Sequence, residues 1–212
     1  MAGMEDTTEE IHRVGHRAFV GGADEYWDII GDLQFRFLVE RGLKPTDLFI
    51  DVACGSLRGG AKFIRYLEPA CYLGIDKYIE LIVYGVSAEL GQDLYREKRP
   101  RFVASDSFEF EKFEVNPAYG LAQSLFTHLC TADVGRCLSK LRAAAAPQCR
   151  LFATFFEVDE PIANPGFSHS HGYYGYTRAE MEKLGVLAGW TSHYIGEWKH
   201  PREQRMIEYI AS

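Results

Sequence analysis

The residues with the clearest chemical signal form a turn of small side chains after an apolar segment. Positions 51–60 read DVACGSLRGG and follow the apolar residues at 48–50, which predicts a strand, a tight turn and then a helix. Small residues in such a turn let the backbone approach a ligand closely, and the start of the next helix offers unpaired N–H groups. The alternative is a plain strand–helix connection without a ligand. The residues that follow the next predicted strands discriminate between the two.

Two aspartates follow the next two predicted strands. Asp76 ends the first of them, 76 − 51 = 25 positions after Asp51, where a carboxylate can accept both hydroxyl groups of a ribose. Asp106 and Phe108 follow the second, and a carboxylate beside an aromatic ring suits the amino group and the face of an adenine. Because the carboxyl ends of consecutive parallel strands converge on one crevice, these residues predict a nucleoside site.

The elements that must position these residues alternate along the chain. Apolar periodicity and turn residues predict helices at 24–41, 58–67, 78–90, 131–146 and 177–188, and strands at 48–53, 71–76, 101–104, 119–124, 150–157, 190–195 and 205–211. Thr131 is the expected cap of its helix, and Thr177 with Glu180 has the spacing of a capping box. Such alternation predicts a mostly parallel sheet with helices on both faces. Only about nine residues join the last two strands, fewer than the dozen or so that a parallel crossover needs, so the closing strand should be antiparallel.

With these features the chain resembles the class I S-adenosylmethionine-dependent methyltransferases, of the bacterial small-molecule type, over nearly its full length. The turn at 51–60 resembles motif I, Asp76 the ribose-binding acid, and Asp106 the adenine-side acid. Residues 122–129 (AQSLFTHL) and 151–157 (LFATFFE) resemble the fourth motif and the fifth strand. Motif I departs from the usual Asp-x-Gly-x-Gly-x-Gly, because Ala53 and Leu57 replace the first and third glycines, and Leu57 predicts a turn that differs in detail.

The resemblance implies a Rossmann-like fold and S-adenosylmethionine as the cofactor. Arg58 can pair with the methionine carboxylate, whereas the small size of Cys54 explains that residue better than reactivity does. The implied cofactor contacts are Asp51, Ala53, Cys54, Gly55, Ser56, Arg58, Asp76, Lys77, Asp106, Ser107, Phe108, Gln123 and Ser124.

Two other readings remain open. An NAD-dependent oxidoreductase also needs a glycine-rich turn and an acid like Asp76, but Gly-x-Gly-x-x-Gly is absent here and no lysine has a tyrosine four positions before it. A catalytically silent module that keeps the cofactor fold would share every feature described so far.

The acceptor is expected to be a small molecule, methylated most readily on oxygen. The amino-group methylases of nucleic acids resemble one another in an Asn/Asp-Pro-Pro-aromatic segment after the fourth strand, where this chain has Gln123-Ser124-Leu125-Phe126, and no Pro-Cys nucleophile is present. Metal-assisted catechol-type enzymes have an aspartate where Gln123 stands. The sequence therefore predicts metal-independent transfer, with the acidic cluster Glu157, Asp159 and Glu160 as the alternative cation site.

A hydroxyl acceptor usually needs a general base, and histidine ordinarily titrates near pH ~6.5. His128 follows the fourth predicted strand, and His169 and His171 lie in the long aromatic loop at 158–176. Long loops in compact domains commonly carry function. The candidate catalytic residues are His128, His169, His171 and Glu157; His193 and His200 are expected to be structural.

Composition limits the partners. The 212 residues carry a net charge of −7, which argues against nucleic acid as the main partner. No apolar run suggests a membrane span, and five cysteines without a Cys-x-x-Cys pair suit a reducing cytoplasm. We expect an N-terminal tail or lid at 1–22, to which His12 and His16 contribute, and one methyltransferase domain at 23–212; the oligomeric state is left open.

Overall fold

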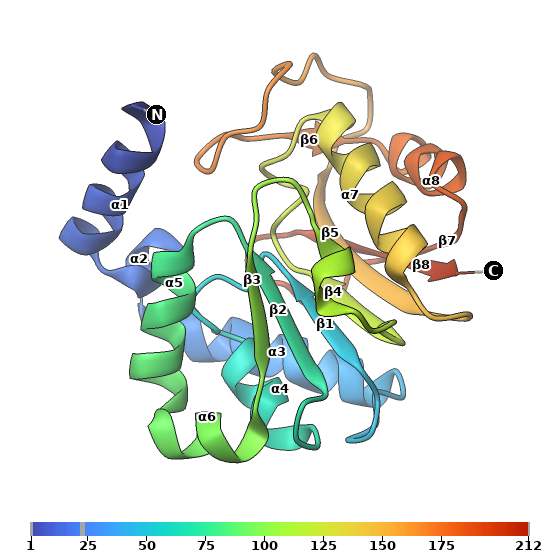
Figure 1. The fold of residues 1–212 in the computed structure, drawn as a ribbon. Helices are drawn as coiled ribbons and strands as arrows, with labels where there is room; N and C mark the ends of the chain where they lie inside the picture. The colour runs from blue at the N-terminus through green and yellow to red at the C-terminus, as the bar shows by residue number, and fades with distance from the viewer. Residues whose placement is uncertain (1, 22–23, 212) are drawn as a thin grey trace. The chain divides into compact units, whose positions relative to one another are not determined.

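The computed structural model describes the backbone of residues 2–21 and 24–211, and the side chains of 7–21 and 25–211. The chain forms two compact units. Figure 1 labels their helices and strands. The first contains Met1–Asp47 and Ala53–Asp106, and the second contains Leu48–Val52 and Ser107–Ser212. The division at residue 22 stays a prediction.

The second unit contains most of the strands. They are β1 (Phe49–Val52), β4 (Tyr119–Ala122), β5 (Arg150–Glu157), the short β6 (Gly175–Tyr176), β7 (Trp190–Gly196) and β8 (Arg205–Ala211). Here β4 pairs in parallel with β1 and β5, whereas β8 lies between β5 and β7 and is antiparallel to both. The predicted antiparallel closing strand is confirmed.

The first turns of two helices in the second unit can be compared with the predicted ones. α8 (Arg178–Leu187) begins with the predicted capping box, in which Thr177 and Glu180 bond to each other's backbone N–H. α7 (Thr131–Ala144) does not begin as predicted: Cys130 is its N-cap residue, and Thr131 is already helical. Among the described residues, no side chain caps the first turn; the Cys130 N–H donates to the Ser168 hydroxyl at 2.9 Å, which ties a distant loop to the start of this helix. A 3₁₀ turn, η2 (Phe110–Phe113), precedes β4.

The first unit contains β2 (Tyr72–Asp76) and β3 (Arg101–Ala104), which pair in parallel with Asp76 level with Ala104. Its helices α3 (Asp24–Glu40) and α4 (Gly60–Tyr66) match predicted helices. The predicted helix at 78–90 is instead α5 (Ile79–Tyr84) followed by a π-helical segment, η1 (Gly85–Leu90). α6 (Gln92–Lys98) was not predicted.

The N-terminal segment is helical where a tail was expected. It forms α1 (Ala2–Val14) and the single turn α2 (His16–Phe19), separated by Gly15. Within the described residues, no helix is long and apolar enough to cross a membrane.

Candidate functional site

The glycine-rich turn adopts a left-handed backbone at alternate residues. Ala53, Gly55 and Leu57 have φ of 61°, 52° and 65°. These are the three motif I positions at which glycine is usual. Leu57 adopts a backbone conformation that favours glycine, so the substitution that was expected to change the turn is accommodated there. A left-handed conformation costs a residue with a side chain roughly 1–2 kcal/mol, so the surrounding structure must compensate at Ala53 and Leu57.

Packing supplies that compensation for Leu57, which is fully buried. Its side chain lies so close to Gly60 and Gly85 that a methyl group added to either would come within 2.8 Å and 2.6 Å of it. The same methyl group on Gly85 would lie 2.8 Å from the Ser56 backbone. The first residue of η1 is therefore pressed against the turn, and burial of Leu57 offsets its backbone strain.

This packing predicts that Gly85→Ala destabilises the protein by roughly 1–3 kcal/mol, the usual cost of overpacking. Gly135→Ala in α7 is the matched control, because the nearest atom to its added methyl group is 3.9 Å away. That control should stabilise the protein by about 0.5–1 kcal/mol, since alanine is the better helix former. Urea unfolding of both variants measures the difference; equal stabilities would contradict the proposed contact.

Asp76 lies against the same turn. Its side chain is 7% exposed; Oδ2 accepts a hydrogen bond from the Gly55 N–H and Oδ1 accepts one from the Tyr78 N–H, each at 2.9 Å. Burial raises the pKa of this carboxyl above its ordinary value, although the backbone hydrogen bonds and Lys77 act in the opposite direction. The structure thus brings the predicted ribose acid and the predicted turn into direct contact.

The other predicted cofactor residues of the first unit lie around this contact. The Cys54 N–H donates to the Ile75 carbonyl at 3.0 Å, so the turn is also tied to β2. Lys77 places its ammonium 4.6 Å from the centre of the Tyr78 ring. Asp106 is exposed, and Ser56 is fully buried, with no hydrogen-bond partner for its hydroxyl among the described residues. Arg58 lies beside Gly21, where an added methyl group would come within 2.5 Å of Nη1.

In the second unit, the predicted cofactor residues are more scattered. Asp51 is buried within β1. The Ser107 carbonyl accepts a hydrogen bond from Lys140 at 2.9 Å, and Phe108 stacks on Phe110 with ring centres 6.2 Å apart. The last two, Gln123 and Ser124, belong to a buried polar cluster at the end of β4.

The aromatic loop after β5 is fixed to the β4–α7 loop through backbone hydrogen bonds. The His169 N–H donates to the His128 carbonyl and the Tyr174 N–H donates to the Thr127 carbonyl, each at 3.1 Å. Ser168 donates to Asp133 on α7. The predicted catalytic histidines His128 and His169 are therefore adjacent, with His171 close in sequence and exposed.

Hydrogen bonds fix the protons of two of these histidines. Nδ1 of His128 lies 2.8 Å from the Gly172 carbonyl, which can only accept, so Nδ1 carries the proton and Nε2 carries the lone pair of the neutral ring. In His169, Nδ1 accepts the His171 N–H at 3.1 Å, so Nδ1 carries the lone pair and the proton is on Nε2. Of these two histidines, His128 has the arrangement of a general base, because the backbone carbonyl of Gly172 holds its ring and leaves the lone pair on Nε2.

Glu157, the fourth catalytic candidate, is bound by side chains of β7 and β8 and not by the β4–α7 loop. Its carboxylate accepts a hydrogen bond from the Tyr194 hydroxyl at 2.6 Å and lies 3.5 Å from Nε of Arg205. Burial and the adjacent Glu157 carboxylate raise the pKa of Tyr194 to about 12. Within the described chain, no three His, Cys, Asp or Glu side chains gather closely enough to hold a metal ion, so Glu157, Asp159 and Glu160 do not form such a site.

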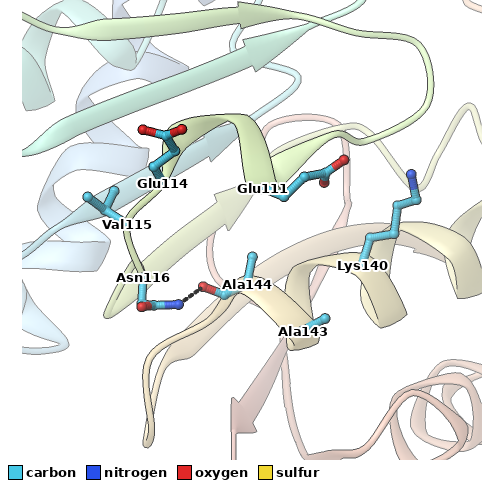
Figure 2. A pocket seen from close by; sticks show the side chains of 7 residues that line it. All are labelled: Glu111, Glu114, Val115, Asn116, Lys140, Ala143 and Ala144. Atoms are coloured by element: carbon cyan, nitrogen blue, oxygen red, sulfur yellow. Dashed lines mark hydrogen bonds between the residues drawn. The ribbon is translucent and has the colours of Figure 1, made fainter.

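A shallow hollow of about 290 Å³ lies elsewhere on the second unit (Figure 2). It contains no predicted site residue, and Val115 and Asn116 in its wall precede β4, whereas the candidates follow β4. Asn116 is already bonded to the Ala144 carbonyl at the end of α7, at 2.8 Å. The hollow is therefore at the opposite end of β4 from the candidate residues.

No protein-family model and no curated protein matches this chain. Solved structures do match. Magnesium protoporphyrin IX methyltransferase from Synechocystis PCC 6803, with bound S-adenosylhomocysteine, has a TM-score of 0.65 at 16% identity and covers 92% of both chains. The 1,6-didemethyltoxoflavin-N1-methyltransferase of Burkholderia thailandensis has a TM-score of 0.66 at 18% identity, over 100% of this chain and 88% of that one.

A third match is an S-adenosylmethionine-dependent methyltransferase from Clostridium acetobutylicum ATCC 824, with a TM-score of 0.62 at 11% identity over 98% of both chains. Each match extends over nearly the whole of both chains, and the predicted Rossmann-like fold class is confirmed. This chain has the fold of the class I S-adenosylmethionine-dependent methyltransferases.

Proposed function

We propose that this protein transfers a methyl group from S-adenosylmethionine to a hydroxyl group of a small molecule. The observation that carries the proposal is the buried contact between Asp76 and the Gly55 N–H, in a turn whose backbone is left-handed at the three positions where motif I usually has glycine. The turn also fits a polar ligand, because the buried Ser56 hydroxyl has no partner among the described residues. The similar structures with bound S-adenosylmethionine or S-adenosylhomocysteine support this choice of cofactor.

We assign the cofactor to Asp76, the turn at 53–57 and the residues after β2 and β3. Asp76 would bind the ribose hydroxyls, Asp106 the adenine amino group, and Arg58 the methionine carboxylate. When bound, the cofactor supplies a methyl group already activated by its sulfonium, so the protein mainly has to align the acceptor and remove its proton.

His128 is the residue that we assign to proton removal. Its Nδ1–H is held by the Gly172 carbonyl, so Nε2 accepts the hydroxyl proton as the oxygen is methylated. The exposed aromatic side chains Phe167 and Tyr173, 69% and 58% exposed, lie in the loop that contains Gly172. Because the Tyr173 ring stacks on Phe156, Phe167 and the other face of Tyr173 offer ring surfaces to a planar acceptor. The names of the similar enzymes, which act on a protoporphyrin and a toxoflavin precursor, agree with an acceptor of this kind.

Thermal unfolding tests the cofactor assignment first. S-adenosylmethionine should raise the melting temperature, whereas NAD should not; the opposite result would favour an oxidoreductase. Release of S-adenosylhomocysteine in the presence of an acceptor then separates an enzyme from a silent binding module. We propose that no cation takes part, so EDTA should leave the measured rate unchanged.

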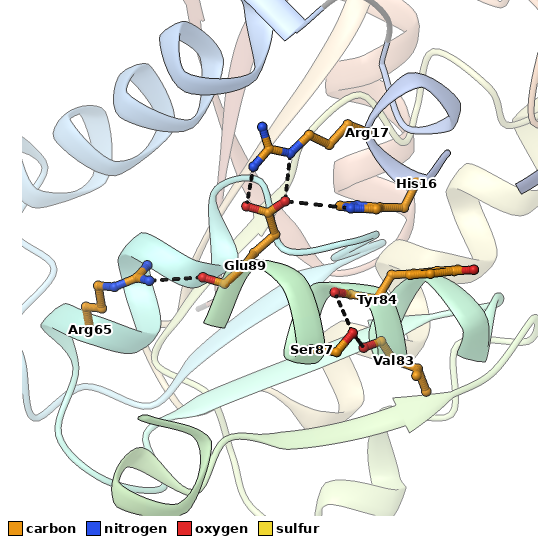
Figure 3. Close-up of polar contacts among 7 residues, drawn as sticks. All are labelled: His16, Arg17, Arg65, Val83, Tyr84, Ser87 and Glu89. Atoms are coloured by element: carbon orange, nitrogen blue, oxygen red, sulfur yellow. Dashed lines mark hydrogen bonds and ion pairs between the residues drawn. The ribbon is translucent and has the colours of Figure 1, made fainter. Parts of the chain in front are cut away.

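We also propose that the N-terminal segment is a lid over the cofactor turn. Arg17 forms two hydrogen bonds to the Glu89 carboxylate of η1, at 2.7 and 2.9 Å, and the His16 ring stacks on Tyr84 (Figure 3). Burial lowers the pKa of His16, so the charged partner of Glu89 at neutral pH is Arg17. Val20 approaches the turn, since a methyl group on Gly55 would lie 3.2 Å from its side chain.

Glu89→Gln should therefore loosen the lid. Arg17 is 41% exposed, so solvent screens the pair and its loss should cost at most about 1 kcal/mol. We expect S-adenosylhomocysteine to dissociate roughly two- to fivefold faster and trypsin to cleave more rapidly at Arg13 and Arg17. The control is Glu109→Gln, which removes the exposed pair with Lys112. Indistinguishable behaviour of the two variants would remove the support for a lid.

A further inference from the structure

A buried polar cluster lies where β4 and β5 end and β8 begins. Because β8 is antiparallel to β5, its first residues lie at the edge formed by the carboxyl ends of β4 and β5. Ligands of open α/β sheets bind outside this edge. Thr154, Gln204 and His200 are 0%, 3% and 6% exposed. The cluster consists of Gln123, Ser124, Thr154, His200 and Gln204.

One end of the Gln123 side-chain amide is held by three groups. Its Nε2 atom lies 2.9 Å from Oε1 of Gln204, 3.0 Å from the Ser124 hydroxyl and 3.2 Å from Nε2 of His200. Gln204 is held in turn by the Thr154 hydroxyl at 2.8 Å. The other end of the Gln123 amide is buried and has no hydrogen-bond partner among the described residues. The cluster therefore leaves one hydrogen bond of Gln123 for a ligand.

Whether Gln123 donates or accepts that hydrogen bond depends on which ring nitrogen of His200 carries the proton. The Arg202 N–H donates to Nδ1 of His200 at 3.2 Å, so Nδ1 carries the lone pair and Nε2 carries the proton. A proton on Nε2 needs an acceptor, and the Gln123 amide, 3.2 Å away, supplies one when its oxygen faces His200. Oxygen and nitrogen of an amide have the same shape and are assigned from their hydrogen bonds. We therefore place the oxygens and nitrogens of Gln123 and Gln204 in exchanged positions. The Gln204 NH₂ group then donates to the Thr154 hydroxyl, and the Gln123 NH₂ group lies at the unpartnered end.

We propose that the NH₂ group of Gln123 binds the methyl acceptor by donating a hydrogen bond to an oxygen or ring nitrogen near the reacting hydroxyl. His200 and Gln204 are positioning residues, which act by fixing the direction of the Gln123 amide. We place this contact near the reacting hydroxyl because Gln123 and His128, the proposed base, both follow β4 in the β4–α7 loop. This inference rests on the proposed function, and it assigns Gln123 to the acceptor rather than to the cofactor.

The experiment has a spectroscopic and a binding readout. Nitrogen-15 spectra of the imidazoles should show His200 protonated at Nε2. The binding probes are 3-hydroxyacetophenone and 3-ethylphenol, which have similar size and differ in one carbonyl oxygen, titrated calorimetrically into protein saturated with S-adenosylhomocysteine. We expect the first to bind at least about tenfold more tightly, the effect of one good hydrogen bond. Gln123→Glu should abolish this preference, whereas Gln92→Glu on exposed α6 should retain it.

Two conservative variants separate positioning from a merely structural role. The amide of His200→Gln reaches the Nε2 position and should retain the preference, whereas that of His200→Asn reaches only the Nδ1 position and should lose it. Protonation at Nδ1, equal behaviour of these variants, equal affinities of the probes or no binding of either probe would overturn the inference. Failure of the native protein to bind S-adenosylhomocysteine would refute the proposed function instead, and the probes titrated alone would still decide the role of Gln123.

Discussion

His128→Ala is expected to lower the rate of methyl transfer by at least about a hundredfold, because general-base help is typically worth ~100- to 10,000-fold. The Gly172 carbonyl keeps the proton on Nδ1 and leaves the basic lone pair on Nε2. Affinity for S-adenosylhomocysteine should remain unchanged, since none of the proposed cofactor contacts involves this residue. The pH–rate profile should lose its acidic limb, because that limb reports protonation of the base.

Two further variants make this result specific. Asparagine at position 128 can still donate to the Gly172 carbonyl but cannot take up a proton, so His128→Asn should be as slow as His128→Ala. His169→Ala should have a much smaller effect, because Nδ1 of His169 already accepts the His171 N–H. Near-native turnover in His128→Asn would show that the side chain only holds the loop, and transfer would then depend on proximity alone or on another base.

The parts of the fold that depend on residues close together in the sequence could be predicted. The strand at 150–157 was predicted with the bounds observed, because its residues form one mostly apolar run with a charged residue at each end. Thr177 and Glu180 encode their capping box within four residues. The break of the predicted helix at 78–90 was missed because its cause is distant: Gly85 packs against Ser56 and Leu57, and the chain continues there as a π-helix.

The same distinction holds for the site. The contact of Asp76 with the turn could be predicted because the end of a strand places this residue, and the small residues around Gly55 indicated a tight turn. The left-handed backbone of Leu57 could not be predicted, since it depends on burial against Gly60 and Gly85. The contacts of His200 and Gln204 with Gln123 could not be predicted, because an irregular loop brings them together across 77 and 81 positions.

Asp76→Ala is expected to weaken binding of S-adenosylhomocysteine at least about tenfold. Each charge-assisted hydrogen bond to a ribose hydroxyl typically contributes ~1.5–3 kcal/mol, and ~1.4 kcal/mol corresponds to a factor of ten. Isothermal titration calorimetry measures the change directly. The control is Asp93→Ala on α6, whose fully exposed side chain should leave the affinity unchanged.

The variant also releases the turn, because the Asp76 carboxylate accepts the Gly55 N–H. Urea unfolding must therefore accompany the titration, and Asp76→Asn serves as the second variant. Asparagine has one side-chain oxygen, so it can bond well to only one of the two backbone N–H groups and should give an intermediate loss of affinity. An affinity equal to that of the native protein in a folded Asp76→Ala variant would refute the ribose assignment.

The pH dependence separates the charge of Asp76 from its structural role. Burial raises its pKa in the folded protein, so the charged carboxylate lowers the free energy of unfolding at neutral pH. That cost decreases as the pH falls below the raised pKa and is gone below the pKa of the unfolded chain. Cofactor affinity should change in the opposite direction, because only the ionised form accepts both ribose hydroxyls. Native affinity should therefore decrease at a pH above the usual aspartate range, whereas the affinity of Asp76→Ala should be constant there. A parallel decrease in both proteins would assign the titration to another group.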